Sequence, residues 1–203
     1  MKIYDISQEV FSCVVFPGDP SPKKHTLCSM EYGALYNLTT FSMCSHNGTH
    51  VDAPSHFIRD GKTVDELPLE KTVGQVFVAQ HQGVITADDA HVILERANDG
   101  GRYATKRILI KGKATLSLEA AEVFAKEKLD LFGNESQTVG PEDAPMAVHL
   151  ALLGAETVLL EGVRLENVPE GWYLLCAAPL SLGGAEGAPC RAILIDLDGA
   201  GTR

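Results

Sequence analysis

Residues 46–56, which read His-Asn-Gly-Thr-His-Val-Asp-Ala-Pro-Ser-His, concentrate side chains that bind divalent metal ions. His46, His50 and Asp52 stand at even positions, and successive side chains of an extended chain point to opposite faces. An extended segment would therefore aim these three groups into one cavity. Neutral imidazole and carboxylate are good ligands for Zn²⁺ and also suit Mn²⁺. The spacing predicts a metal site in this segment.

The other residues of the segment support this hypothesis. Asp52 is the natural bridging ligand if two ions bind, because a carboxylate offers two oxygens. Gly48 would let the backbone pass close to the metal, and Thr49 could hydrogen-bond a ligand. Pro54 interrupts sheet pairing, so His56 could lie on a loop and have a different function. The alternative interpretation is a histidine-rich surface loop.

Two further candidates lie far along the chain. His149 falls on the predicted inward face of a helix, where a lone histidine is usually a core residue. Its expected neighbours on that face are Met146, Leu150 and Leu153. Glu161 ends the apolar run 158–160, where a carboxylate is costly to bury unless it is paired or metal-bound. An exposed strand end would suit Glu161 equally well.

The remaining histidines and cysteines are weaker candidates. Cys44 is close enough to reach the site, but better oxygen and nitrogen ligands follow it. The five cysteines are scattered without a Cys-x-x-Cys pair, which predicts free thiols rather than a disulfide framework. We interpret three isolated histidines as structural or exposed: His25, His81 and His91.

Composition and charge exclude several classes of function. The length of 203 residues suits one domain over 1–203. A formal net charge of -10 argues against nucleic acid and anionic membranes as partners. No apolar run approaches the roughly 20 residues that cross a bilayer, and the N-terminus lacks the apolar stretch of a signal peptide. We therefore expect a cytoplasmic protein.

The surrounding sequence predicts strands at both ends of the chain and alternating strands and helices between them. Strands are expected over the ranges 2–7, 12–16, 39–49, 73–79, 107–110, 157–161, 172–177 and 191–195, with a turn at 17–20. One helix begins after Thr86 and repeats apolar residues at Ala90, Ile93, Leu94 and Ala97. Others are predicted over 118–128, capped by Ser117, and over about 143–153, capped by Asp143. The pattern favours an α/β fold with a parallel central region and an antiparallel layer.

Residues 46–56 also match, at every fixed position, the pattern His-x-Gly-Thr-His-x-Asp-x-Pro-x-His. The chain therefore resembles the cyclase-like metal hydrolases, the family of bacterial kynurenine formamidase and isatin hydrolase. Residues 16–19, Phe-Pro-Gly-Asp, are similar to that family's aromatic-Pro-Gly-Asp turn, and residues 160–163 and 188–192 are similar to its C-terminal blocks. The resemblance implies a single-domain layered fold of the swivelling β/β/α type and a homo-oligomer, a dimer or higher.

The resemblance also implies roles for individual residues. Asp52 would be shared between two ions, His56 would be the general acid/base, and Phe16 would contact the substrate. The implied activity is hydrolysis of an amide in a small molecule, either an N-formyl aryl amide or a cyclic amide. Zn²⁺ is the favoured ion and Mn²⁺ the alternative, with one or two ions per chain. The implied metal ligands are His46, His50, Asp52, His149 and Glu161.

Two departures from the family leave the substrate open. Phe16 stands where the kynurenine formamidases carry tryptophan, and residues 110–112 read Ile-Lys-Gly where the family often has Arg-Thr-Gly. Both positions are expected near the substrate rather than the metal. A metal-containing binding protein without turnover and a lyase or cyclase remain as alternatives. Mixed ligands that include carboxylates favour an open catalytic site over a closed structural one.

Overall fold

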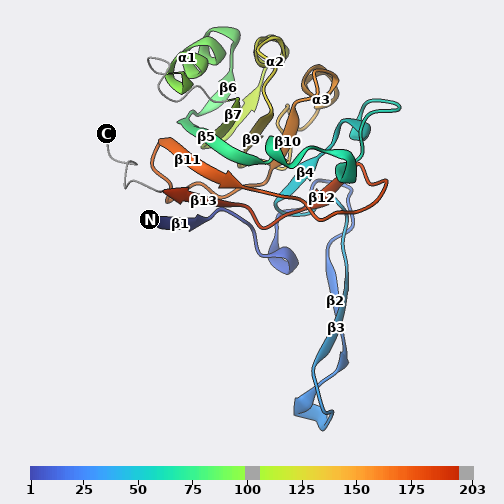
Figure 1. Cartoon of the computed structure of the whole chain (residues 1–203). Coiled ribbons are helices and arrows are strands. Elements are labelled where there is room, and N and C mark those ends of the chain that lie inside the picture. The colour runs from blue at the N-terminus through green and yellow to red at the C-terminus, as the bar shows by residue number, and fades with distance from the viewer. Residues whose placement is uncertain (99–105, 197–203) are drawn as a thin grey trace.

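A nine-stranded mixed sheet runs through the part of the chain that this computed structural model describes, residues 1–98 and 106–196 (Figure 1). Its strand order is β1-β13-β11-β5-β7-β9-β10-β4-β12. The strands in the first part of that order are β1 (Lys2–Asp5), β13 (Ile193–Asp196), β11 (Gly171–Cys176), β5 (Val73–Gln80) and β7 (Arg107–Lys111). The others are β9 (Leu131–Asn134), β10 (Val158–Glu161), β4 (His50–Asp52) and β12 (Gly187–Pro189).

The centre of the sheet is parallel and both of its ends are antiparallel. β5, β7, β9 and β10 pair in parallel, whereas β11, β13 and β1 extend one end and β4 and β12 the other in antiparallel register. A parallel strand covered on both faces needs apolar side chains on both. Ile108, Leu109 and Ile110 of β7 are accordingly all fully buried. The expected mixed α/β fold class is confirmed.

Three helices cover one face of the parallel centre: α1 (Ala87–Ala97), α2 (Leu118–Lys126) and α3 (Met146–Gly154) (Figure 1). Phe124 of α2 packs on Phe132 of β9 with ring centroids 5.1 Å apart. The opposite face forms a second apolar cluster that includes Leu109, Leu131 and Leu160 together with residues of β11, β13 and β4. The antiparallel strands therefore curl back to bury the face that the helices leave uncovered.

The first two predicted helix starts are confirmed. Thr86 caps α1 by accepting a hydrogen bond from the Asp89 amide, and the Asp89 carboxylate accepts one from the Thr86 amide. Ser117 caps α2 by accepting from the Ala120 amide. Both caps accept hydrogen bonds from N–H groups that the first turn of a helix leaves unpaired. None of the helices in the described ranges is long and apolar enough to cross a membrane.

The predicted start and buried face of the third helix are wrong. Its cap is Pro145, not Asp143, because the Ala144 amide closes a turn on the Pro141 carbonyl before the helix begins. Its buried face also differs, since Met146 and Leu150 are exposed. The buried residues of α3 are Val148, His149, Leu152 and Leu153.

Two strand predictions near the N-terminus were also wrong. Residues 12–16 form no strand, and the Val14 amide bonds instead to the Gln8 side chain. The range 39–49 is split: β3 (Leu38–Ser42) ends early, and turns occupy 45–46 before β4. Short strands that the pattern missed are β2 (Lys23–Cys28), β6 (Gly83–Ile85), β8 (Ala114–Leu116), β9 and β12.

Two small sheets accompany the large one. β6 and β8 pair in parallel beside the helices. β2 and β3 form an antiparallel hairpin that projects away from the rest of the molecule (Figure 1).

Candidate metal centre

Strand β4 carries two of the predicted ligands on one face. His50 and Asp52 alternate with Val51, so their side chains point the same way. β4 is paired with β10 so that His50 lies opposite Glu161. The His50 Nε2 atom is 3.3 Å from Asp52 Oδ1 and 3.5 Å from Glu161 Oε2. The sheet register, which no short motif encodes, thus brings the distant glutamate to the site.

The helix α3 supplies the next group. His149 Nε2 lies 3.3 Å from Glu161 Oε1 and 3.8 Å from Asp52 Oδ2. The His149 Nδ1 atom contacts the Pro145 carbonyl oxygen at 2.8 Å, which fixes the orientation of the ring. The helix α3 and the strand β10 therefore bring His149 and Glu161, both from the C-terminal half of the chain, against the segment 46–56.

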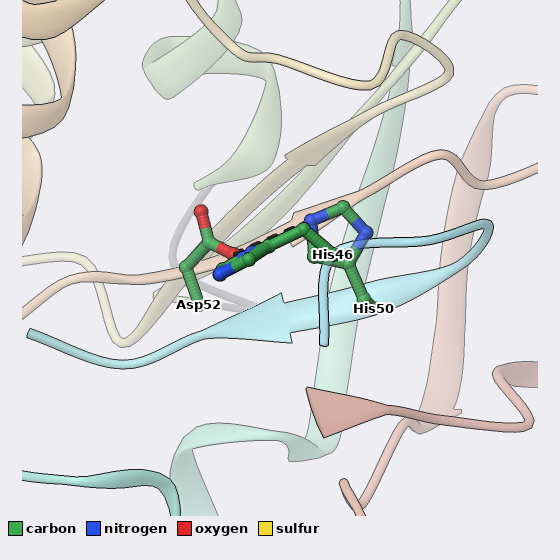
Figure 2. A group of neighbouring side chains, drawn as sticks. All are labelled: His46, His50 and Asp52. Carbon is green, nitrogen blue, oxygen red and sulfur yellow. Dashed lines mark hydrogen bonds and ion pairs between the residues drawn. The ribbon is translucent and has the colours of Figure 1, made fainter. Parts of the chain in front are cut away.

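His46 reaches the site by a turn and not by the extended chain that its spacing suggested. The Asn47 amide bonds to the Cys44 carbonyl, and Gly48 adopts a left-handed conformation with φ of 67°. The strand begins only at His50. His46 Nδ1 nevertheless lies 2.8 Å from Asp52 Oδ1, and Figure 2 shows the side chains of His46, His50 and Asp52 meeting beside β4. The predicted convergence is present, but the predicted local geometry is wrong.

The donor atoms fall into two overlapping groups. One comprises His46, His50 and Asp52, the other Asp52, His149 and Glu161, and within each group the donor atoms lie within 4.8 Å of one another. Among the described residues, His50 Nε2 and Asp52 Oδ2 are buried without a hydrogen-bond partner. A buried polar atom without a partner is costly. Coordination of a divalent cation would satisfy both atoms, so the residues present fit one or two ions.

The electrostatics of the cluster also favour a cation. Burial opposes a charge on His50, but the carboxylates of Asp52 and Glu161 outweigh it and raise the pKa of His50 to about 10. Burial likewise opposes ionisation of Asp52, yet the hydrogen bond with His46 and the charge of the neighbouring His50 ring hold its pKa well below the usual range. The cluster thus retains the ionised Asp52 carboxylate and attracts positive charge, which a metal ion would supply.

His56 shares the cavity but belongs to neither donor group. It follows Pro54 on a short 3-10 helix, and its ring stacks on His46 with centroids 4.1 Å apart. Burial lowers the pKa of His56, so the ring is neutral at neutral pH. The cavity measures about 240 Å³ and is lined by Phe16, Asp19, His46, His50, His56, Phe57, Gln137, Thr138, Pro145, His149 and Glu161.

A hydrogen-bond network that the sequence did not reveal holds the segment 46–50 in place. Thr49 Oγ1 donates to the Gly162 carbonyl at 2.8 Å and accepts from the Gln8 amide, so it does not bond a ligand side chain as expected. Gln137 Nε2 donates to the Gly48 carbonyl at 2.9 Å. Gln8 Nε2 in turn donates to Gln137 Oε1. These amides support the backbone from which His46 and His50 project.

Glu186 is a second residue that the sequence reasoning missed. Its Oε1 atom lies 3.2 Å from His46 Nε2 and accepts from Ser45 Oγ at 2.6 Å. The neighbouring Gly187 leaves room for the imidazole, because a Cβ there would approach His46 Cε1 within 2.7 Å. Both residues come from the other side of β4, where β12 pairs with it. A pattern search confined to residues 46–56 could not find them.

The cysteines and the three isolated histidines are not part of the two donor groups. Cys44 Sγ faces Asp19 Oδ2 at 3.9 Å, and Cys44 is in neither donor group. All five cysteines are free. Of the isolated histidines, His25 and His91 are exposed and His81 is half-buried.

Residues 110–112 are not among those that line the cavity, and their place near the substrate stays a prediction. Ile110 is fully buried in the core beneath the helices. Lys111 Nζ donates to the Glu166 and Val168 carbonyls. The Ile-Lys-Gly departure therefore has a structural role, whereas Phe16 does line the cavity.

Adding metal to chelator-treated protein is expected to raise its melting temperature. Binding to the folded state alone stabilises it by about 2.7 kcal/mol when the free ion is at 100 times its Kd, which corresponds to roughly 5–10 °C for a chain of this size. Differential scanning fluorimetry with Zn²⁺ and Mn²⁺, with Mg²⁺ for comparison, measures the shift. An unchanged melting temperature at saturating Zn²⁺ and Mn²⁺ would contradict the site.

Comparisons with known proteins agree with this geometry. A family model described as "Putative cyclase" matches residues 4–141. A kynurenine formamidase from Erythrobacter litoralis is 31% identical over an alignment 211 residues long, which covers 98% of this chain and 96% of that protein.

Solved structures show the same fold. One described as a potential metal-dependent hydrolase with cyclase activity has a TM-score of 0.79 and 27% identity, and the match covers 95% of this chain and 96% of that one. Isatin hydrolase A from Labrenzia aggregata has a TM-score of 0.79 and 23% identity, with coverage of 95% and 93%. At 23% identity, the second match supports a shared fold and nothing further.

Proposed function

This chain belongs to the cyclase family, and we propose that it is a metal-dependent amidohydrolase that acts on a small molecule. The observation that carries the proposal is the convergence of three histidines and two carboxylates from separate elements beside one cavity, which His56 also lines. Full-length similarity to a kynurenine formamidase supports cleavage of a C–N bond. The substrate class we propose is an N-formyl aryl amide or a cyclic amide.

In this proposal the metal ligands are divided between the two donor groups. His46, His50 and Asp52 would hold one ion, and Asp52, His149 and Glu161 would hold a second. When bound, the metal lowers the pKa of water and polarises a carbonyl oxygen. Zn²⁺ is the ion we favour for this donor set and Mn²⁺ the alternative, because imidazole and carboxylate suit both.

His56 is the proton carrier in this mechanism. Its neutral ring faces the cavity beside the ligands, which is the state a general base requires. The imidazole accepts a proton from the attacking water and then delivers it to the departing nitrogen. The stacked contact with His46 and the edge contact with Phe57 hold the ring toward the ligands.

Phe16 is the substrate contact we propose. Its side chain lines the same cavity, at the turn where Asp19 N–H donates to the Phe16 carbonyl. An aromatic ring at this wall packs on a planar substrate group. The smaller ring of phenylalanine, compared with the tryptophan of kynurenine formamidases, leaves room for a different planar substrate.

We further propose that the chain is one domain over 1–203 and acts in the cytoplasm as a homo-oligomer. The continuous nine-stranded sheet supports the first point. The acidic net charge of -10 is consistent with small-molecule partners rather than nucleic acid.

An assay of purified protein loaded with Zn²⁺ or Mn²⁺ tests the function. The panel should contain N-formyl anilines, cyclic amides and lactones, with liquid chromatography and mass spectrometry of the products. We expect turnover of an amide with addition of water, which releases formate from a formanilide. Full metal occupancy without turnover of any compound would favour a binding protein. Products that lack the elements of water would favour a lyase or cyclase.

A further inference from the structure

Two of the three histidines in the donor groups are anchored by backbone carbonyls. The Nδ1 atom of His149 lies 2.8 Å from the Pro145 carbonyl oxygen. The Nδ1 atom of His50 lies 3.0 Å from the Gly48 carbonyl oxygen. A neutral imidazole carries one N–H, so a ring that donates from Nδ1 to a carbonyl offers the lone pair of Nε2. Both Nε2 atoms accordingly face the cluster, where each lies within 3.5 Å of Glu161.

His46 is anchored through the opposite nitrogen and by a different kind of group. Its Nε2 atom lies 3.2 Å from Glu186 Oε1, whereas its Nδ1 atom lies 2.8 Å from Asp52 Oδ1. Asp52 belongs to both donor groups and Glu186 to neither. The Nε2 atom of His46 is therefore turned away from the shared carboxylate, and Nδ1 is the nitrogen that faces it.

The Glu186 carboxylate is itself held by neighbouring groups. Its Oε1 atom accepts a hydrogen bond from Ser45 Oγ at 2.6 Å. The Glu186 backbone carbonyl accepts from the Ala53 amide at 2.8 Å. The next residue, Gly187, lies opposite Asp52 in the pairing of β12 with β4. Glu186 is thus fixed to the strand that carries two of the donor residues.

The ring of His46 has little freedom to turn. A Cβ on Gly187 would approach His46 Cε1 within 2.7 Å and Nδ1 within 3.3 Å, so the ring lies directly against the backbone of β12. The His56 ring stacks on it with centroids 4.1 Å apart. These contacts favour one orientation of the ring, in which Nε2 meets Glu186.

We propose that Glu186 is a positioning residue that makes His46 bind its ion through Nδ1, whereas His50 and His149 bind through Nε2. A carboxylate that accepts the N–H of a metal-binding imidazole fixes the ring and makes its other nitrogen a stronger donor. Ser45 keeps the carboxylate in place. This role rests on the ligand assignment of the proposed function, but not on which bond the enzyme cleaves.

Glu186 also balances charge between the two donor groups. The group Asp52, His149 and Glu161 contains two carboxylates, whereas the group that includes His46 contains only the shared Asp52. Glu186, one imidazole away, brings a second negative charge to that group. Because the Glu186 side chain is 44% exposed, solvent screens part of this attraction. The orientation of the ring is therefore the larger effect we expect.

Nuclear magnetic resonance of the full chain, with ¹⁵N in its histidine rings and loaded with Zn²⁺, tests the proposal directly. Long-range ¹H–¹⁵N correlations separate Nδ1 from Nε2 and a metal-bound nitrogen from a protonated one. We expect zinc on Nδ1 of His46 and on Nε2 of His50 and His149. Zinc on Nε2 of His46 would overturn the proposal while leaving the metal site intact. A chain whose histidine rings bind no Zn²⁺ would overturn the metal site as well.

Competition with a fluorescent zinc chelator measures the contribution of Glu186 to affinity. Glu186→Ala is expected to raise the Kd of the ion bound by His46 about 10- to 100-fold. Glu186→Gln keeps a hydrogen-bond acceptor and should raise it less. Ser45→Ala should have a smaller effect and add little to Glu186→Ala, because it acts through the same carboxylate. Glu122→Gln, an exposed position on α2, is the matched control.

The melting temperature of the metal-free variants separates positioning from a role in the fold. Metal-free Glu186→Ala should melt within about 2 °C of the wild type, since a partly exposed side chain contributes little to stability. An unchanged Kd for Zn²⁺ in Glu186→Ala would overturn the proposal. So would a weaker Kd accompanied by a large fall in the melting temperature of the metal-free protein.

Discussion

Replacing Asp52 with asparagine is expected to abolish stable metal binding in both donor groups and to lower kcat/KM by about 10³-fold or more, or about 4 kcal/mol in the transition state. Asp52 is the residue the two groups share, and its carboxylate is buried between His46, His50 and His149. An amide of the same shape keeps one oxygen but loses the charge that balances the cation. The loss of one side chain should therefore affect both ions.

The measurement is metal content by plasma mass spectrometry together with steady-state kinetics on the substrate identified in the panel. Asp88→Asn is the matched control, since Asp88 is an exposed residue in the first turn of α1, remote from the cavity. Circular dichroism checks that the fold is retained. An Asp52→Asn protein with wild-type metal content and unchanged turnover would rule out Asp52 as the shared ligand.

Replacing His56 with alanine is expected to separate metal binding from catalysis. The variant should retain its metal, because His56 is in neither donor group, while kcat falls by about 10² to 10⁴-fold, the usual contribution of a general acid/base. Isothermal titration with Zn²⁺ and single-turnover kinetics measure the two quantities separately. Added imidazole, which fits the space left by the ring, should restore part of the rate.

The stacking of His56 on His46 offers an alternative cause for lost activity. If His56 only supports His46, then the Kd for Zn²⁺ should rise in parallel with the loss of rate, and imidazole should not rescue turnover. His91→Ala is the control, since His91 is an exposed histidine on α1. Unchanged turnover in a metal-loaded His56→Ala protein would show that another group carries the proton.

Local sequence was sufficient to predict a structural element where that element depends only on its own residues. The helix starts at Thr86 and Ser117 were readable because a cap is formed by side chains within one turn. The parallel strand β7 was readable because burial on both faces demands a continuous apolar run. The start of α3 could not be predicted from local sequence, because a turn between Pro141 and Ala144 takes precedence over the capping preference of Asp143.

The sequence by itself determined the chemistry of the site. The composition of residues 46–56 indicates the types of the proposed ligands, and the resemblance adds His149 and Glu161, which the structure brings beside Asp52. Only the tertiary structure decided how these groups meet. The register of β4 on β10 sets Glu161 opposite His50, and a turn at Gly48, not an extended strand, returns His46 to Asp52.

The support of the site was likewise decided by the tertiary structure. Gln8, Gln137 and Glu186 approach the segment 46–50 from three distant parts of the chain. A hydrogen bond between residues so far apart leaves no recognisable pattern in the sequence, because it depends on how the sheet curls and which strands pair. The ligand types can be read in one segment of eleven residues, whereas their geometry exists only once the sheet has closed around them.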